Sequence, residues 1–508
     1  EPTTLSSKAS AATPLKPSVA HSRAHFVETT QRVLAKLGVS SISLDASMLE
    51  SGLDSLGATE LSYRLRELTG VPLPSTLTFD QPTTRAVVDH LLAHTDKLQS
   101  DTPIEAASCP QAPPAPPCLA MLQVHAVASK APGSIDTLTS FSMLLQAAGD
   151  AVRPVPVARW TPLAHQCSMA ACMSGVERFD APFFGISAAE ADSMDPQQRL
   201  VLEVSYEALH RASHRRNTLM GSRTGVHLAV EHLDWQLLQV MTTSETALQR
   251  SSIYAASGEQ GHVASGRLSF VLGLHGPTMS INTACSSGLV VVHLGAAALR
   301  AGECEQELSP GVKAMLLPFA LAPSILALDG RSKSFDARAD GYGRSEAVAA
   351  TTLAAGDGTG PLLTGSAVRS GGRGASLTAP NGAGQVRTIA LALETAAATA
   401  TEVGCIQAQG LGSALADPIE VNAIMVALGG SRESQLVIGS HKANVGHSEA
   451  PSGLIGCVTA LAAMQDETMA GNAQLRAINS MLTPLSLHMA APLLWPMSEL
   501  KQPGPGLC

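Results

Sequence analysis

The chain has 508 residues, of which 45% are hydrophobic and 15% charged, so it carries enough apolar side chains for a large core. Its net charge of −9, with no basic block, argues against nucleic acid as a partner. No apolar run approaches the ~18 residues that cross a bilayer, so we expect no membrane span. The nine cysteines are dispersed without the spacing of metal ligands. This predicts no metal site and favours a reducing compartment, cytoplasm or plastid, over a disulfide framework.

The first part of the chain predicts a small helical module between two extended segments. Residues 1–21 are rich in Ser, Thr, Ala and Pro and are expected to form a flexible N-terminal segment, either a linker or the remnant of a transit peptide. Within residues 22–94, apolar side chains recur at helical spacing in three places, around Phe26, Leu61 and Val88. The segment 95–118 contains six prolines and predicts a semi-rigid linker.

Beyond the linker, strands and helices are expected to alternate over residues 119–496, which predicts an α/β architecture. Two helix starts are strongly signalled. Asp195-Pro196 is followed by Gln198, and Asp417-Pro418 is followed by Glu420. Each start thus combines an N-cap acid, a proline at N1 and an acceptor at N3. Residues 497–508 are expected to be a C-terminal tail.

Cys285 stands where an extended run is expected to turn into a helix. The local sequence is Thr283-Ala-Cys-Ser-Ser287, and an apolar, helix-like segment follows from Leu289 to Ala297. A thiol at a helix N-terminus feels the positive end of the macrodipole, which favours the nucleophilic thiolate, and the first amides can hold an oxyanion. The alternative is a buried structural cysteine, the commoner role of a free cysteine.

Thr-Ala-Cys-Ser-Ser resembles the active-site signature of the β-ketoacyl synthases, the condensing enzymes of polyketide and fatty-acid assembly. Seven further motifs stand in the order of that family over roughly residues 120–460. They are Arg178–Ser187, Met194–Arg199, Ser332–Asp336, Ala339–Arg344, Leu377–Gly382, Asp417–Asn422 and Lys442–His447. The chain is therefore identified as similar to a fragment of a type I polyketide synthase, in which an acyl carrier protein precedes a ketosynthase domain.

The resemblance implies a fold and a set of partners. Residues 119–496 would form a thiolase-like ketosynthase domain with layered α/β/α/β/α architecture, and residues 22–94 a small all-α carrier bundle. The substrates would be acyl thioesters, and the partners other polyketide synthase chains or modules. Because family members are homodimers, we also expect a homodimer or a place in a larger assembly.

Asp54-Ser55, at the expected start of the second helix, resembles the attachment site of acyl carrier proteins. Ser55 is therefore expected to bear 4′-phosphopantetheine. A phosphodiester suits a helix N-terminus, where free amides and the dipole favour an anion. The alternative is that Ser55 only caps the helix. Its place in a helical module tethered to a synthase-like domain favours the carrier interpretation.

Condensation in this family needs a nucleophile and two imidazoles. The resemblance assigns the nucleophile to Cys285, which would take the acyl chain as a thioester. It assigns one imidazole to His447, which would hydrogen-bond the thioester carbonyl of a malonyl-type extender as carbon dioxide is lost. Lys442 and Glu449 match positions where the family keeps a charge pair that supports the site.

The second imidazole is replaced by an amide. The resemblance leads us to expect a His-Gly-Thr-Gly-Thr segment before the helix at Asp417, but the chain reads Gln409-Gly-Leu-Gly-Ser413. A glutamine amide can donate a neutral hydrogen bond, but it cannot accept a proton or become cationic. Losing one oxyanion donor typically costs about 10²–10³ in rate. Polyketide synthase modules that lack this histidine resemble the non-elongating type, which passes acyl chains on without extending them.

A Gly-Phe-Gly-Gly-Thr-Asn-type loop, expected from the resemblance after Trp495, is missing from the sequence, which reads Pro496 to Cys508 through Lys-Gln-Pro-Gly-Pro-Gly. In the family that loop gives a backbone amide to the oxyanion hole beside the cysteine. Three explanations stay open: the chain was cut, a companion chain supplies the loop, or catalysis has been abandoned.

Three functions are compatible with the sequence. The first is a carrier–ketosynthase didomain that accepts an acyl chain on Cys285 and passes it on, with weak condensation. The second is a catalytically retired relative kept as a structural or interaction subunit. The third is a competent condensing enzyme in which Gln409 replaces histidine. The intact Cys285 favours the first function, whereas the missing loop favours the second.

Overall fold

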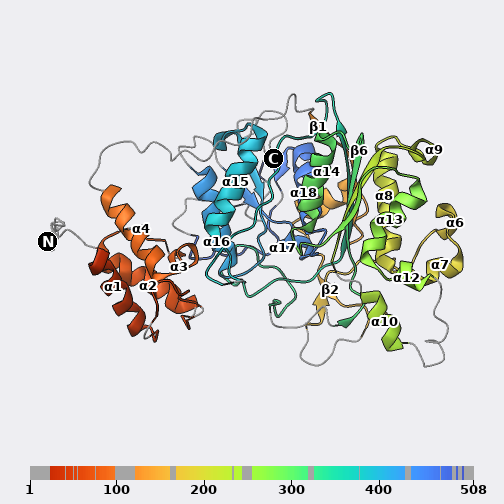
Figure 1. Cartoon of the computed structure of the whole chain (residues 1–508). Helices are drawn as coiled ribbons and strands as arrows, with labels where there is room; N and C mark the ends of the chain where they lie inside the picture. Colours follow the sequence, from red (N-terminus) through yellow and green to blue (C-terminus); the bar gives the residue numbers. More distant parts are fainter. Residues whose placement is uncertain are drawn as a thin grey trace, which may run out of the picture. The chain divides into compact units, whose positions relative to one another are not determined.

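The computed structural model describes residues 23–39, 42–49, 51–53, 55–71, 73–74, 76–97, 121–160, 167–231, 234–242, 254–318, 325–376, 378–429, 436–469, 471–482, 488–489 and 495–496. The chain forms two compact units, residues 1–109 with 373–381 and residues 110–372 with 382–508. Figure 1 shows their elements in the colours of the sequence. Each unit is described by itself.

The first unit is a bundle of helices. The sequence predicts three of them, which are α1 (Arg23–Lys36), α2 (Ser55–Thr69) and α4 (Thr84–Lys97), but not the short α3 (Leu77–Asp80). α1 packs against both α2 and α4. Their apolar stripes meet in a core whose fully buried side chains include Phe26, Leu34, Leu61, Leu65, Val87 and Leu91. α4 continues to Lys97, into the segment predicted as linker.

The second unit is built on a six-stranded sheet with the order β5-β4-β6-β7-β1-β8. Its strands are β1 (Leu122–Lys130), β4 (Thr224–Val230), β5 (Thr278–Ile281), β6 (Gln306–Lys313), β7 (Ala347–Ala355) and β8 (Leu362–Leu363). β4 runs parallel to β5 and to β6, while β7 is antiparallel to both β6 and β1. Every residue of β4 and β6 is buried, as expected of strands covered on both faces.

Helices cover both faces of this sheet. On one face α8 (Pro196–Arg211) packs on β1, β6 and β7, and α13 (Gly261–Leu272) packs on β4 and β5. On the other face α14 (Ser287–Arg300) packs on β4 and β6, next to α18 (Ser452–Asp466), which also contacts α5 (Leu138–Gln146). Figure 1 shows the sheet between these two layers.

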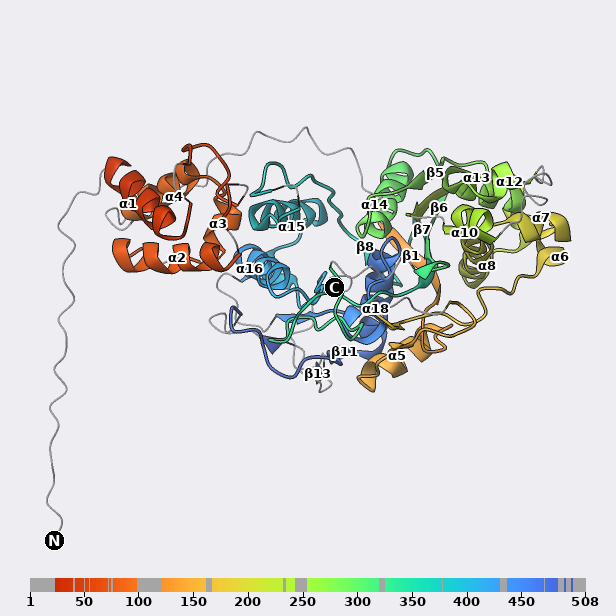
Figure 2. The same cartoon turned by 90° about the horizontal axis from the view of Figure 1, so that it is seen from below.

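A second sheet and a further pair of helices complete the unit. β9 (Cys405–Gln407), β10 (Val437–Gly439) and β12 (His488–Met489) are parallel, and α18 contacts β9. α16 (Ala416–Leu428) packs with α15 (Gly382–Ala396) and shares an apolar core with β10. The layers therefore alternate helix, sheet, helix, sheet, helix, and the two views together let the reader follow them (Figure 2).

Short elements connect the layers. They are α6 (Ala181–Phe184), α7 (Ala188–Ser193), α9 (Arg216–Leu219), α10 (Asp234–Thr242), α12 (Ala255–Gly258), α17 (Lys442–Val445), the 3₁₀ helix Ala400–Glu402, and the strand pairs β2 (Arg153–Pro154) with β3 (Met169–Ala170) and β11 (Thr468–Met469) with β13 (Trp495–Pro496).

Two glycines let α14 and α18 approach closely. A Cβ added at Gly288 would lie 2.9 Å from the Leu454 backbone nitrogen and 3.0 Å from the Ala450 carbonyl oxygen. One added at Gly453 would lie 3.0 Å from the Leu289 backbone nitrogen. Because these neighbours are backbone atoms, they cannot yield as a flexible side chain would. The helix that follows Cys285 is therefore fixed against the helix that follows His447.

The two predicted helix starts have different outcomes. Asp195 caps α8 as expected, since its carboxylate accepts the Gln197 N–H at 2.7 Å and Pro196 is the first helical residue. The prediction at Asp417 is wrong, because α16 begins at Ala416 and its N-cap is Leu415. The Asp417 carboxylate instead accepts backbone N–H groups of the loop before the helix and of Phe335. A tertiary partner thus uses the acid that local sequence assigns to capping.

Several predicted segments lie outside the described residues. These are the N-terminal segment 1–21, most of the linker, the tail 497–508 and Asp54. Within the described ranges, none of the helices combines the length and the apolar character needed to cross a membrane.

Candidate active site

Cys285 lies between a strand and a helix, as the sequence predicts. β5 ends at Ile281, and α14 begins at Ser287 with Ser286 as N-cap. The turn between them is tight, because Ala284 has φ +52°, a left-handed conformation that is uncommon for a residue with a Cβ. Cys285 is a free cysteine at this helix start and is partly exposed.

Polar side chains hold the turn around Cys285 in place. The Thr283 N–H donates to Ser287 Oγ at 2.7 Å, and Ser287 Oγ donates to the Ala284 carbonyl at 2.7 Å. The Asn282 side chain accepts the Ala284 N–H at 3.0 Å. Ser287 therefore closes the turn around Cys285, which fixes the backbone from which the cysteine side chain extends.

The other predicted site residues follow β9 and β10. Gln409 comes two residues after β9, Lys442 is the first residue of α17 after β10, and His447 follows α17. Because β9 and β10 are parallel, the segments that leave their carboxyl ends emerge at one edge of the sheet. Ser440 joins the two segments, since its hydroxyl donates to the Gln409 carbonyl at 3.3 Å and accepts the Lys442 N–H at 3.4 Å.

Electrostatic interactions connect Lys442 to the cysteine. The Lys442 ammonium is buried and interacts electrostatically with Glu420 and with Cys285. Glu420 in turn accepts the N–H groups of Gln409 at 2.6 Å and of Gly410 at 2.8 Å. Burial lowers the pKa of Lys442 to about 8, against the opposing attraction of Glu420. A lysine with this pKa changes its charge near pH 8, within electrostatic range of Cys285.

The pKa of Lys442 predicts how stability depends on pH. Because the folded-state pKa of about 8 lies below the ordinary 10.5, the unfolded chain binds more protons between these values, so the free energy of unfolding rises with pH there. We expect wild type to gain up to about 3 kcal/mol over Lys442→Met across this interval. Urea denaturation followed by circular dichroism at several pH values measures the difference. If the free energies of unfolding of the two proteins changed with pH in the same way, the pKa of Lys442 would not be lowered in the folded state.

His447 is buried in a defined tautomer. Its Nδ1 accepts the Glu449 N–H at 3.2 Å, so the proton resides on Nε2, which can donate. Burial lowers the pKa of His447 well below its usual range, and the positive charges of Lys442 and Arg344 lower it further. The ring packs edge-on to Tyr342, with the centroids 5.1 Å apart. A neutral imidazole held in this way is a hydrogen-bond donor rather than an acid.

The expected charge pair between Lys442 and Glu449 is wrong. Glu449 forms ion pairs with Lys313, at 2.8 Å, and with Arg344. The acid with the strongest electrostatic effect on the pKa of Lys442 is Glu420 on α16. Glu449 has φ +54°, which turns the chain after His447 and directs its carboxylate to Lys313 at the end of β6.

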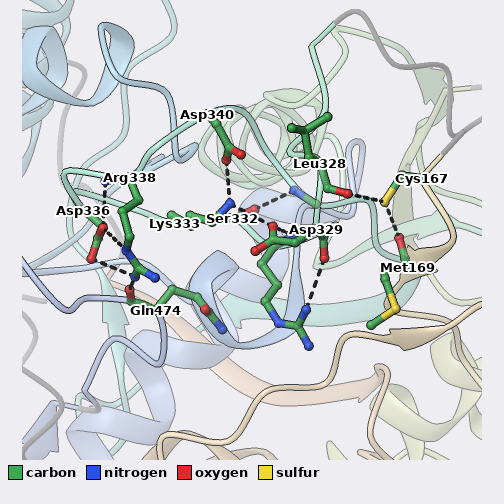
Figure 3. A network of polar contacts seen from close by, with 12 residues as sticks. Cys167, Met169, Leu328, Asp329, Ser332, Lys333, Asp336, Arg338, Asp340 and Gln474 are labelled. Atoms are coloured by element: carbon green, nitrogen blue, oxygen red, sulfur yellow. Dashed lines mark hydrogen bonds and ion pairs between the residues drawn. The ribbon is translucent and has the colours of Figure 1, made fainter. Parts of the chain in front are cut away.

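The segment that carries Tyr342 and Arg344 is held by buried charges that the sequence motifs do not reveal. Glu346 accepts the backbone N–H groups of Met173 and Met315, each at 2.7 Å, and pairs with Arg159 at 2.9 Å. Upstream, a network fixes the loop before Tyr342, as Figure 3 shows. Lys333 bridges Asp329 at 2.8 Å and Asp340 at 2.6 Å, and Arg338 pairs with Asp336 at 2.8 Å.

Ser55 is the first residue of α2, in the first unit. Its side chain lies outside the described residues. The helix has no acidic residue in its first turn, so its free amides and dipole suit an anionic phosphodiester.

Lys442 thus connects the elements of the site: it interacts electrostatically with Cys285 and with the neutral His447, and Ser440 connects its backbone to the Gln409 segment. Such a set can bind a thioester carbonyl and accept its acyl group. Tyr342, Lys313 and Glu420 also belong to this neighbourhood, but the sequence does not predict them as site residues. It predicts Glu420 only as an N3 acceptor of its own helix.

Family models match both units of the chain. Residues 28–91 match "Phosphopantetheine attachment site". Residues 122–357 match "Beta-ketoacyl synthase, N-terminal domain", and residues 362–476 match "Beta-ketoacyl synthase, C-terminal domain".

The curated relatives are polyketide synthases. The spectinabilin polyketide synthase system protein NorA' of Streptomyces orinoci is 37% identical over 448 residues, which are 85% of this chain and 12% of that protein. The erythronolide synthase EryA2 of Saccharopolyspora erythraea is 35% identical over 458 residues, again 85% of this chain and 12% of that protein. The chain therefore spans only a small part of the length of these relatives.

Solved ketosynthases have the same fold. The oxazolomycin ketosynthase domain OzmH KS7 of Streptomyces albus JA3453 gives a TM-score of 0.69 at 28% identity and covers 74% of this chain and 71% of that chain. The ketosynthase from module 6 of the bacillaene synthase of Bacillus subtilis 168 gives a TM-score of 0.67 at 25% identity and covers 74% of this chain and 67% of that chain. The thiolase-like layered fold is thereby confirmed. The chain belongs to the β-ketoacyl synthases of type I polyketide synthases, with a phosphopantetheine-attachment domain ahead of the ketosynthase domain.

Proposed function

We propose that this chain accepts acyl groups from thioesters on Cys285 and passes them on, and that its capacity for decarboxylative condensation is impaired. One observation carries the proposal. The partly exposed Cys285 interacts electrostatically with Lys442, and Lys442 with His447, whereas Gln409 stands at the sequence position where the family resemblance leads us to expect a second imidazole.

The acyl transfer step needs only the nucleophile and local electrostatics. Cys285 Sγ attacks the carbonyl carbon of an acyl thioester, and the new carbon–sulfur bond forms as the bond to the donor sulfur breaks. The donor leaves as a free thiol with the proton that Cys285 gave up. Lys442 interacts electrostatically with Cys285, and no imidazole has to take the proton in this exchange.

Condensation requires more of the site. Carbon dioxide leaves a malonyl-type thioester as negative charge builds on the thioester oxygen, and donors to that oxygen lower the barrier. His447 can give one hydrogen bond through Nε2. A Gln409 amide can donate a hydrogen bond, but it cannot accept a proton or become cationic as an imidazole can, so we infer that the enolate has less stabilisation than two imidazoles would provide.

The carrier part of the proposal rests on Ser55. We infer that 4′-phosphopantetheine is attached there, where it would carry acyl chains as thioesters. The N-terminus of α2 accommodates the phosphate charge without an opposing carboxylate in its first turn.

We further propose that the ketosynthase unit is a homodimer formed through β5. This strand ends its sheet within the described ranges, so its outer backbone groups are available to a second copy. The elements beside it expose apolar side chains, Phe270 on α13 and Leu289 on α14, which are 86% and 51% exposed. These features suit a symmetric interface.

Changing Phe270 tests the dimer. We expect Phe270→Glu to weaken self-association by about tenfold or more, because it places a charge in an apolar interface. Light scattering after size exclusion measures the change. Val426→Glu, at an exposed apolar position on α16, is the matched control and should stay dimeric. A monomeric wild type would refute the interface.

The proposed activity is tested by supplying the substrates. The purified chain is incubated with a phosphopantetheinyl transferase, an acyl-CoA and a malonyl thioester, and both protein mass and products are recorded. We expect acyl mass on Cys285 with little β-keto product. A β-keto product formed as fast as the cysteine is loaded would overturn the impairment. Acyl mass found on Ser55 alone would instead support the alternative that the ketosynthase unit is a structural subunit.

A further inference from the structure

Glu449, two residues after His447, has an unfavourable backbone conformation. Its φ of +54° lies in the left-handed region, which a residue with a Cβ adopts only when surrounding contacts compensate. In this conformation its N–H donates to His447 Nδ1 at 3.2 Å. The turn therefore acts directly on the imidazole.

Two cations hold the side chain of Glu449. The Lys313 ammonium lies 2.8 Å from Oε2, and Arg344 pairs with the other carboxylate oxygen. Lys313, at the end of β6, is 3% exposed, and Glu449 is 8% exposed. Ion pairs withdrawn from water are screened little, so they constrain geometry more than surface pairs do.

Arg344 is in turn held by contacts with Tyr342 and His447. Its guanidinium carbon lies 5.2 Å from the centroid of the Tyr342 ring, and its backbone pairs with that of His447. Tyr342 also packs against the His447 ring. The carboxylate of Glu449 thus connects the end of β6 with the segment that carries Tyr342 and Arg344, which contacts the His447 ring and backbone.

We propose that Glu449 is a positioning residue: its ion pairs with Lys313 and Arg344 hold residue 449 in the left-handed turn, and the turn directs an N–H to His447 Nδ1 that keeps the proton on Nε2. This inference rests on the proposed function only for the use that is made of the Nε2–H donor. The positioning itself belongs to the resting protein.

The experiment measures the tautomer of His447 directly, through the chemical shifts of its two ring nitrogens. The chain is labelled with ¹⁵N-histidine, and the His447 resonances among those of 16 histidines are assigned as the ones lost in His447→Gln. In wild type we expect an unprotonated Nδ1 and a protonated Nε2. In Glu449→Ala the two nitrogen shifts should move toward each other, because the second tautomer becomes populated. Lys313→Met should move them in the same direction.

A glycine variant separates positioning from general destabilisation. Glu449→Gly keeps the N–H and adopts a positive φ freely, so we expect its His447 shifts to stay near those of wild type. Glu467→Ala is the matched control, because Glu467 also has a positive φ, +52°, but caps the far end of α18. It should leave the His447 shifts unchanged.

Two results would overturn the inference: Glu449→Ala with wild-type nitrogen shifts, or Glu449→Gly with shifts displaced as far as in Glu449→Ala. The measurement needs no turnover. A wild-type chain that never loads acyl groups on Cys285 would refute the proposed function, while the nitrogen shifts would still decide the role of Glu449.

Discussion

Gln409→His is expected to raise the rate of β-keto product formation by up to about 10²–10³-fold, the value of one complete oxyanion donor, because an imidazole replaces an amide that supplies only part of this stabilisation. The backbone at this position is already fixed, since Glu420 holds the N–H groups of Gln409 and Gly410. The side chain of a histidine introduced at this position would therefore extend from a fixed backbone. Single-turnover assays with acyl-loaded protein and a malonyl thioester measure the rate, with products separated by mass spectrometry.

Gln407→His is the matched control for this gain. Gln407 is the last residue of β9, two positions upstream, and its amide faces the sulfur of Met469. A histidine there should leave product formation at the wild-type level. If a folded Gln409→His protein loads acyl groups normally but makes no more product than wild type, the glutamine is not what limits condensation.

Cys285→Ala is expected to abolish acylation of the ketosynthase unit. Other thiols in the described ranges are less reactive: burial raises the pKa of Cys457 and of Cys304 to about 11, which leaves these cysteines protonated. Intact-mass measurement after exposure to an acyl-CoA gives the result directly. The acylation of Ser55 through an attached arm should be unaffected.

Cys167→Ala is the control for thiol accessibility. Cys167 is half-buried like Cys285, but its sulfur faces the carbonyls of Met169 and Leu328 rather than a helix start. This variant should load as wild type does. Retained loading in Cys285→Ala, together with its loss in Cys167→Ala, would move the nucleophile to another part of the unit.

The position of Cys285 could be predicted because its signal is local. An extended run, a short polar turn and an apolar helix lie within about twenty residues, and the structure places β5, the turn and α14 there. The three helices of the first unit were predictable for the same reason, since their apolar residues recur at helical spacing.

Charge pairing was less predictable because it depends on the fold. The family resemblance predicts a charge pair between Lys442 and Glu449. The positive φ of Glu449 directs its carboxylate to Lys313 on β6, more than a hundred positions earlier. Asp417 and Glu420 show the same effect, because a loop takes the carboxylates that local rules assign to their own helix.

Peptide mapping of the acylated protein tests the role of Cys285 most directly. Trypsin cleavage after Arg267 and Arg300 releases Leu268–Arg300, in which Cys285 is the only cysteine. After incubation with an acyl thioester, we expect tandem mass spectrometry to find the acyl group on this peptide, at Cys285. An acyl group found on other cysteines, or only on an arm at Ser55, would contradict the assignment of Cys285 as the acyl acceptor.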